Sequence, residues 1–197
     1  MNNRATKNLK EDHMLIRRLR NVAKVCSEKL FANIEIPIED IEIISVVMEE
    51  FVDRFHHGKE EKAYFPETQD KDGFSEDIRK FLIEHELGRR IAMMLRREIN
   101  NWKNNEIKTI EPIARFLKSY SVFIDEHTMK EDSFFGMITA KNSISEKEDE
   151  KLLKHYELCV NNVSGIERLK QAVKLIEFLE NRKWMNDNTI HNQYCVV

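Results

Sequence analysis

Glycine and proline are scarce in this chain, and their scarcity restricts the fold class. The 197 residues include only five glycines and three prolines. An all-β fold of this length would need many more turn residues, so long helices are favoured. Hydrophobic residues make up 41% of the chain and charged residues 34%, a balance that supports one globular domain with a polar surface.

Paired cysteines, lysine-rich blocks and long apolar runs are also lacking. The three cysteines, Cys26, Cys159 and Cys195, are far apart and form no CxxC pair, so we expect reduced thiols. With a net charge of −3 and no lysine-rich block, neither nucleic acid nor a membrane is an expected partner. The N-terminus does not resemble a signal peptide, and no run of about 18 apolar residues occurs. We therefore expect a soluble, cytoplasmic protein.

Helix-period patterns dominate the sequence that is present. They predict four long helices, at about residues 6–31, 38–66, 75–102 and 112–135, with polar or proline-containing breaks between them. Gly136 is predicted to end the fourth helix. Because the connections are short, residues 1–140 are expected to form an up-down-up-down four-helix bundle, and the predicted fold class is all-α.

One or two further helices are predicted after the bundle. Ser145 followed by Glu148 fits a capping box, and amphipathic patterns follow at about residues 145–161 and 165–184. Residues 141–185 are therefore expected to form a helical extension of the same domain that packs on the bundle. The tail, residues 186–197, has little pattern and is expected to be flexible.

Histidine is the chemically informative residue on these helices. The chain has seven: His13, His56, His57, His85, His127, His155 and His191. At about 100° per residue, His127 and Glu131 fall on the apolar stripe of the fourth helix, whereas Asp132 points outward. His85 also shares a face with apolar residues, and His13 lies on a flank of the first helix that can turn inward. Each of these side chains is a candidate for the bundle interior.

The second helix offers two pairs of histidine and glutamate that are four residues apart. His56 and Glu60 share their side with acidic residues, a face that we expect to be wet. His57 and Glu61 share theirs with apolar residues, so this pair is predicted to face inward. Glu60 remains an alternative ligand, in place of Glu61 or beside it.

Four imidazoles and two carboxylates in one bundle core would be costly to bury without a compensating cation. The predicted metal ligands are His13, His57, Glu61, His85, His127 and Glu131. Six mixed ligands exceed the four that a structural zinc prefers, and calcium or magnesium would require mostly oxygen. Imidazole with carboxylate suits a pair of iron ions, or less often manganese. Two irons with six protein ligands keep open positions that can bind dioxygen, peroxide or nitric oxide.

Four segments together carry a recognisable pattern. They are LKEDHMLIRRL around His13, FHHGKEEKAYFP around His57 and Glu61, EHELGRR around His85, and FIDEHTMKEDSFF around His127 and Glu131. In order and spacing, the sequence resembles the hemerythrin-like, HHE cation-binding family over about residues 9–136. The resemblance implies an up-down bundle around a non-haem centre of two iron ions (Fe2+/Fe3+) with an oxo or hydroxo bridge. It also implies that His13 and His57 bind one iron, that His85 and His127 bind the other, and that Glu61 and Glu131 bridge them.

The sequence departs from the oxygen-carrying members of that family. Their third helix bears two histidines four residues apart, whereas the second position here is Arg89, which cannot ligate iron. The fourth-helix carboxylate follows its histidine by four residues, at Glu131, rather than by five. Fewer histidines argue against reversible oxygen storage and favour reaction with peroxide or nitric oxide, or sensing. Tyr64 and Tyr120 lie on the ligand faces and are candidates to donate a hydrogen bond to a bound oxygen species.

The expected function is that of a non-haem di-iron protein that binds or senses a small oxidant. The candidate ligands are dioxygen, nitric oxide and peroxide, bound at a carboxylate-bridged site. The alternatives are a di-iron enzyme that removes peroxide or nitric oxide, and a bundle that stores or handles iron. The sequence assigns no catalytic residue, and it leaves open whether the protein is an enzyme.

Overall fold

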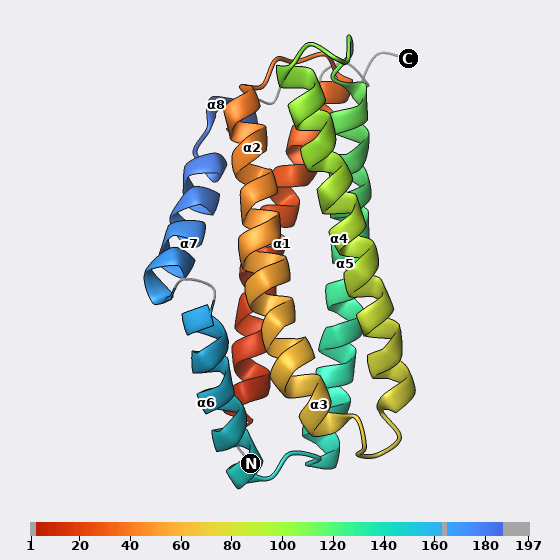
Figure 1. The fold of residues 1–197 in the computed structure, drawn as a ribbon, viewed down its shortest axis with the longest axis vertical. Helices are drawn as coiled ribbons and strands as arrows, with labels where there is room; N and C mark the ends of the chain where they lie inside the picture. The colour runs from red at the N-terminus through yellow and green to blue at the C-terminus, as the bar shows by residue number, and fades with distance from the viewer. Residues whose placement is uncertain (1–2, 163–164, 187–197) are drawn as a thin grey trace.

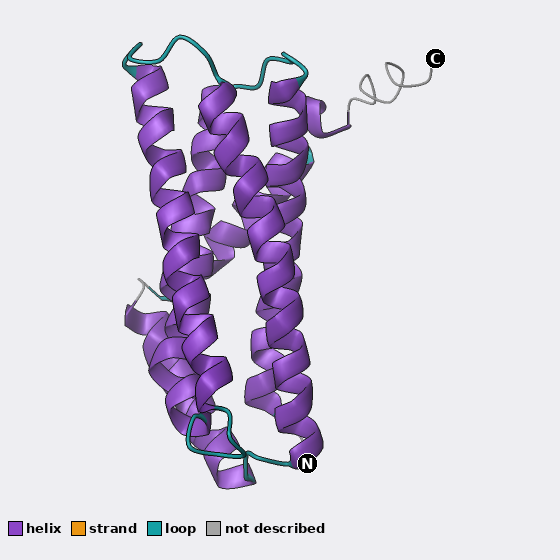
Figure 2. Ribbon diagram, turned by 90° about the vertical axis from the view of Figure 1, so that its right-hand side faces the viewer, coloured by secondary structure: helices purple, strands orange, loops and turns teal. Residues whose placement is uncertain are grey.

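A computed structural model describes residues 3–162 and 165–186 of the chain. All regular secondary structure in these ranges is helical, which confirms the all-α prediction (Figure 2). The main elements are α1 (Arg4–Phe31), α2 (Ile38–Val47), α4 (Ser75–Lys103) and α5 (Glu111–Lys141). The second segment is continuous from α2 through the π-helical η1 (Met48–His57) and η2 (Glu60–Tyr64) into α3 (Phe65–Thr68).

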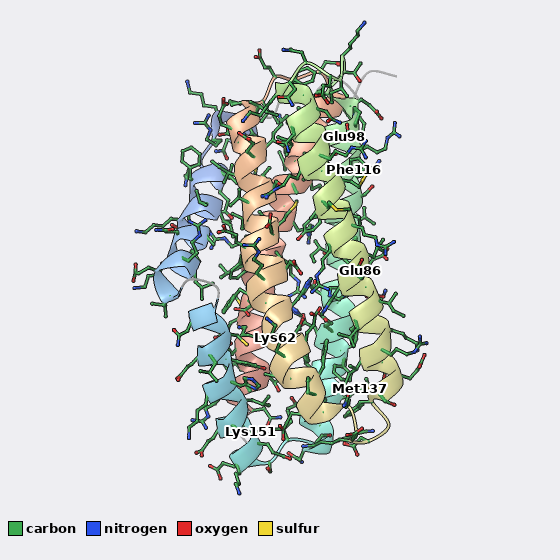
Figure 3. All side chains as sticks on the ribbon, in the orientation of Figure 1. Lys62, Glu86, Glu98, Phe116, Met137 and Lys151 are labelled. Atoms are coloured by element: carbon green, nitrogen blue, oxygen red, sulfur yellow. The ribbon has the colours of Figure 1, made fainter. Side chains whose placement is uncertain are left out.

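The long helical segments run side by side and alternate in direction along the chain (Figure 1). The α1 helix rises from the N-terminus, the α2-to-α3 segment descends, α4 rises again and α5 descends. Charged side chains such as Glu86 and Lys151 project from the outer faces of the helices (Figure 3). The result is a hemerythrin-like helical bundle.

The apolar core of the bundle falls into two clusters. One includes Ile16, Phe55 and Ile124, and the other includes Leu9 and Phe134. On α1, His13 lies between Leu9 and Ile16, and on α5, His127 and Glu131 lie between Ile124 and Phe134. A layer of buried polar side chains therefore separates the two apolar clusters.

Three shorter helices follow the bundle: α6 (Glu146–Asn162), α7 (Ile166–Glu180) and α8 (Lys183–Asn186). The α6 and α7 helices lie along one side of the bundle (Figure 1). Tyr156 of α6 joins one apolar cluster and Ile176 of α7 joins the other. Residues 187–197 of the predicted tail lie outside the described residues. Within the described part of the chain, no helix is both long enough and apolar enough to cross a membrane.

Two predicted helix ends differ from the structure. Gly136 does not end the fourth helix, because α5 continues to Lys141 and stops where Asn142 takes a left-handed φ of 52°. The second helical segment likewise passes Pro66 and ends at Thr68, the last residue of α3.

Candidate metal centre

The second helical segment changes its geometry where it reaches the polar layer. Its hydrogen bonds reach one residue further than in an α-helix over η1 and η2, so it has more residues per turn. This widening turns His56, His57 and Glu60 into the interior, where they are 1%, 3% and 0% exposed. The expectation that His56 and Glu60 lie on a wet face is therefore wrong, since it assumed α-helical spacing.

Seven buried side chains form two adjacent groups with ligand spacing. His57, His85 and His127 make one group, and His13, His56, Glu60 and Glu131 make the other. Within each group, one ligand atom per residue lies within 4.8 Å of all the others. The groups draw on α1, η1, η2, α4 and α5, so the whole bundle is needed to assemble them.

The two carboxylates lie between the groups. Glu131 has one oxygen 3.2 Å from His13 Nε2 and 3.3 Å from His127 Nε2, and its other oxygen is 3.3 Å from His85 Nε2. Glu60 lies 3.4 Å from the Nε2 atoms of both His56 and His85. Each carboxylate thus reaches imidazoles of both groups, which is the placement that a bridging ligand requires.

An outer layer of acids faces the other nitrogen of each imidazole. The Nδ1 distances are 3.0 Å for His13 to Asp132, 3.2 Å for His56 to Asp12, 3.6 Å for His57 to Asp53, 2.7 Å for His85 to Glu61 and 2.8 Å for His127 to Glu84. Four of these contacts are hydrogen bonds, in which Nδ1–H donates to a carboxylate. Such a bond fixes the tautomer and leaves Nε2 available as a ligand.

Basic side chains hold these acids in turn. Arg17 binds Asp132, Lys59 binds Asp12, Arg89 binds both Asp53 and Glu61, and Lys130 binds Glu84. Lys59 is only 1% exposed and also donates to Asn8, at 2.7 Å. The imidazoles are therefore oriented from outside by a connected set of ion pairs.

The structure brings most of the predicted ligands together, but Glu60 takes the place of Glu61 and His56 joins the set. His13, His57, His85, His127 and Glu131 lie in the two groups. Glu60, the alternative carboxylate, lies there too, while Glu61 lies outside both groups and binds His85 and Arg89. His56 was missed, and so was the role of Asp132, which accepts from His13 although its helical angle points outward. A signal was available: acids directly adjoin His13, His85 and Glu131 in the sequence, at Asp12, Glu84 and Asp132.

Burial and neighbouring charges shift the pKa values of the group members in different directions. Burial lowers the pKa of His56 to about 4 and that of His57 well below its usual value. Burial and the nearby Glu131 carboxylate raise the pKa of Glu60 well above its usual value. Burial opposes ionisation of Glu131 as well, but the surrounding imidazoles, His127 first and then His13 and His85, hold the pKa of Glu131 well below its usual range.

Several buried atoms of the two groups have no hydrogen-bond partner among the described residues. They are both ring nitrogens of His57, Nε2 of His127, both carboxylate oxygens of Glu60 and Oε2 of Glu131. Buried polar atoms are normally paired, because each unpaired one costs about 1–3 kcal/mol. Cations bound between the groups would give a partner to all of these atoms except His57 Nδ1, which faces Asp53. The donor set, imidazole nitrogen with carboxylate oxygen, fits redox metals such as iron.

The two candidate tyrosines differ in their surroundings. The Tyr64 hydroxyl lies 2.8 Å from the hydroxyl of Thr6, so it already has a partner. The Tyr120 hydroxyl is buried and has no partner among the described residues. Burial raises the pKa of both phenols, so both stay protonated and can donate.

A helical bundle with two adjoining groups of buried imidazoles and carboxylates defines a class of cation-binding protein. The family model of the hemerythrin HHE cation-binding domain matches residues 4–138, more than half of the chain. The chain therefore belongs to this family, as the resemblance of its four motifs indicated. Comparison with curated proteins gave no match, and comparison with solved structures gave none either.

Proposed function

We propose that this protein holds two iron ions in the polar layer and there binds or senses a small oxidant: dioxygen, nitric oxide or peroxide. The observation that carries the proposal is the outer layer of acids. Each of the five inward imidazoles has a carboxylate facing its Nδ1, and each carboxylate has a basic partner. Histidines that only fill a core have no need of this arrangement, whereas metal ligands characteristically have it.

In this proposal, His57, His85 and His127 bind one iron, and His13 and His56 bind the other. Glu60 and Glu131 would help to hold both irons, because each lies near imidazoles of both groups. Glu61 is reassigned from bridging ligand to hydrogen-bond acceptor of His85. When bound, the iron pair would supply redox-active positions for a small oxidant, and the apolar clusters on either side would exclude water.

His57 compensates for the missing second histidine of the third helix. Its ring stacks on the His85 ring, with centroids 3.8 Å apart and an interplanar angle of 11°. A third imidazole thus comes from η1 instead of from α4, where Arg89 stands. The argument against oxygen binding counted four histidines, and five buried imidazoles remove its basis.

Metal analysis of the purified protein tests the proposal directly. We expect about two irons per chain, with Glu60→Gln losing iron and Glu86→Gln, a change at an exposed residue of α4, retaining it. Full iron content in Glu60→Gln would contradict the bridging role, and a wild-type protein that takes up no iron would contradict the proposal as a whole.

Addition of oxidants to the reduced iron protein separates the remaining alternatives. A stable, reversible spectral change on addition of dioxygen or nitric oxide is the result expected of a binding or sensing protein. Rapid gas evolution from peroxide would instead identify an enzyme. Uptake of many more than two irons per chain would identify an iron store.

A further inference from the structure

A pocket of about 410 Å³ lies between η1, α4 and α5 and reaches the three-histidine group. Exposed residues such as Met93 and Arg96 line it, and so do His57 and Tyr120, which are each 3% exposed. The pocket therefore leads from the surface towards the side of the metal centre where His57 lies.

The size of the pocket exceeds what a diatomic ligand needs. One water molecule occupies about 30 Å³ in the liquid, and sites for small organic molecules occupy about 300–1,000 Å³. A volume of about 410 Å³ lies at the scale of a ring-sized organic molecule. A passage for dioxygen or nitric oxide alone could be much narrower.

The lining of the pocket favours a neutral occupant. Its uncharged wall includes Met48, Val52, Ala92, Phe123 and Ile124. Its basic residues already have acidic partners: Arg89 lies 2.6 Å from Asp53, while Arg96 and Arg54 lie 2.6 and 2.5 Å from Glu49. An anion would have to break one of these ion pairs, whereas an apolar molecule leaves them intact.

Two residues of the lining carry buried polar atoms without a hydrogen-bond partner among the described residues: His57, which belongs to the three-histidine group, and Tyr120. The Tyr120 hydroxyl is buried and donates to no described residue. A buried hydroxyl without a partner is costly, and an acceptor on an occupant would relieve that cost. An oxygen atom at one end of an apolar molecule has the required chemistry.

From these observations, we propose that the pocket binds a neutral, largely apolar organic molecule of ring size, whose hydrogen-bond-accepting oxygen meets Tyr120 beside the three-histidine group. The inference deepens the proposed function. It rests on that function in one respect only, namely that a metal ion lies next to the bound molecule. Tyr120 acts as a positioning residue for this ligand.

Binding of cyclohexanone tests the proposal, since it is neutral and ring-sized and has one carbonyl acceptor. Ligand-observed NMR and calorimetric titration of the full chain should show saturable binding. Tyr120→Phe should weaken that binding about three- to tenfold, through loss of one hydrogen bond. Ala92→Trp should abolish it by filling the pocket. Tyr156→Phe is the matched control, because that hydroxyl is also buried without a partner but does not line the pocket.

Several outcomes would overturn the inference. They are a lack of saturable binding, binding that survives Ala92→Trp in a folded variant, an equal effect of the two tyrosine variants, and tighter binding of cyclohexanecarboxylate than of cyclohexanone. Iron content is measured on the same samples. If the chain binds the ketone but takes up no iron, only the proposed function is refuted. If the chain takes up iron but does not bind the ketone, only the proposal about the pocket is refuted.

Discussion

Arg89 occupies the position where the family resemblance leads one to expect a second histidine on the third helix. Its guanidinium lies 2.6 Å from Asp53 and 2.7 Å from Glu61. These two carboxylates face Nδ1 of His57 and of His85, whose rings stack on each other. The arginine therefore does not bind metal itself but fixes the acids behind two imidazoles that can.

Arg89→Gln is expected to weaken iron binding about 10- to 100-fold, the usual effect of removing an outer partner of a metal ligand. Competition with a chelator of known affinity measures the change. Arg90→Gln is the control, because Arg90 is exposed and pairs with Glu86 on the same helix, away from the ligand groups. Equal affinities of the two variants would show that Arg89 does not position the ligands.

At the level of single residues, helix periodicity succeeded where the helix is a regular α-helix. His13, His85, His127 and Glu131 lie on α1, α4 and α5, and all are buried, as their faces indicated. Periodicity failed for His56 because η1 is π-helical, and a spacing of about 100° per residue does not apply to such a segment. The same spacing predicted that His57 faces inward, and it is buried, but it placed the neighbouring His56 and Glu60 on a wet face although both are buried as well.

The same contrast holds at the level of whole helices. The α1 and α4 helices begin and end within two residues of their predicted bounds, since their apolar periodicity is unbroken. The end of α5 was misplaced because Gly136 was taken as a stop signal, although a glycine within a helix costs only about 1 kcal/mol. A π-helical insertion depends on tertiary contacts, so local sequence gave no sign of it.

The capping box of α6 was predicted from its residue spacing and is present. The Ser145 backbone N–H donates to Glu148 Oε2 at 2.8 Å, and the Glu148 N–H lies 3.4 Å from Ser145 Oγ. The Lys71 ammonium and the Ser145 hydrogen bonds lower the pKa of Glu148 to about 2, from an ordinary value of 4.5. This ionised carboxylate ties the start of the C-terminal extension to the bundle.

Glu148→Ala should lower the free energy of unfolding by about 0.5–2 kcal/mol near neutral pH, the usual cost of losing a cap. A carboxyl whose pKa is depressed by folding stabilises the protein above its unfolded pKa and loses this effect at lower pH. The difference between wild type and variant should therefore shrink as the pH falls from about 4.5 towards 2. Denaturant titrations at several pH values measure it, with Glu157→Ala at an exposed position of α6 as control. A difference independent of pH would contradict this account.

At the level of the whole molecule, the polar layer interrupts the apolar core. Five imidazoles and two carboxylates lie where apolar side chains would otherwise join the two clusters, and six of their nitrogen and oxygen atoms lack a hydrogen-bond partner in the part of the chain that the structure describes. Each such atom reduces the stability of the metal-free bundle. The fold therefore gives up part of its stability to assemble the site, and a bound cation would restore it.

Removal of iron is accordingly expected to lower the melting temperature of the whole bundle, because a metal that binds only the folded state stabilises it. With free metal at about 1,000 times its Kd, the stabilisation is about 4 kcal/mol, which corresponds to about 8–16 °C for a domain of this size. Thermal unfolding before and after chelation measures the shift. Glu60→Gln provides the decisive comparison: it lacks one bridging carboxylate, so its melting temperature should respond little to the chelator. An equal response in the variant would place the stabilising metal elsewhere, and no response in wild type would mean that the polar layer is stable without a cation.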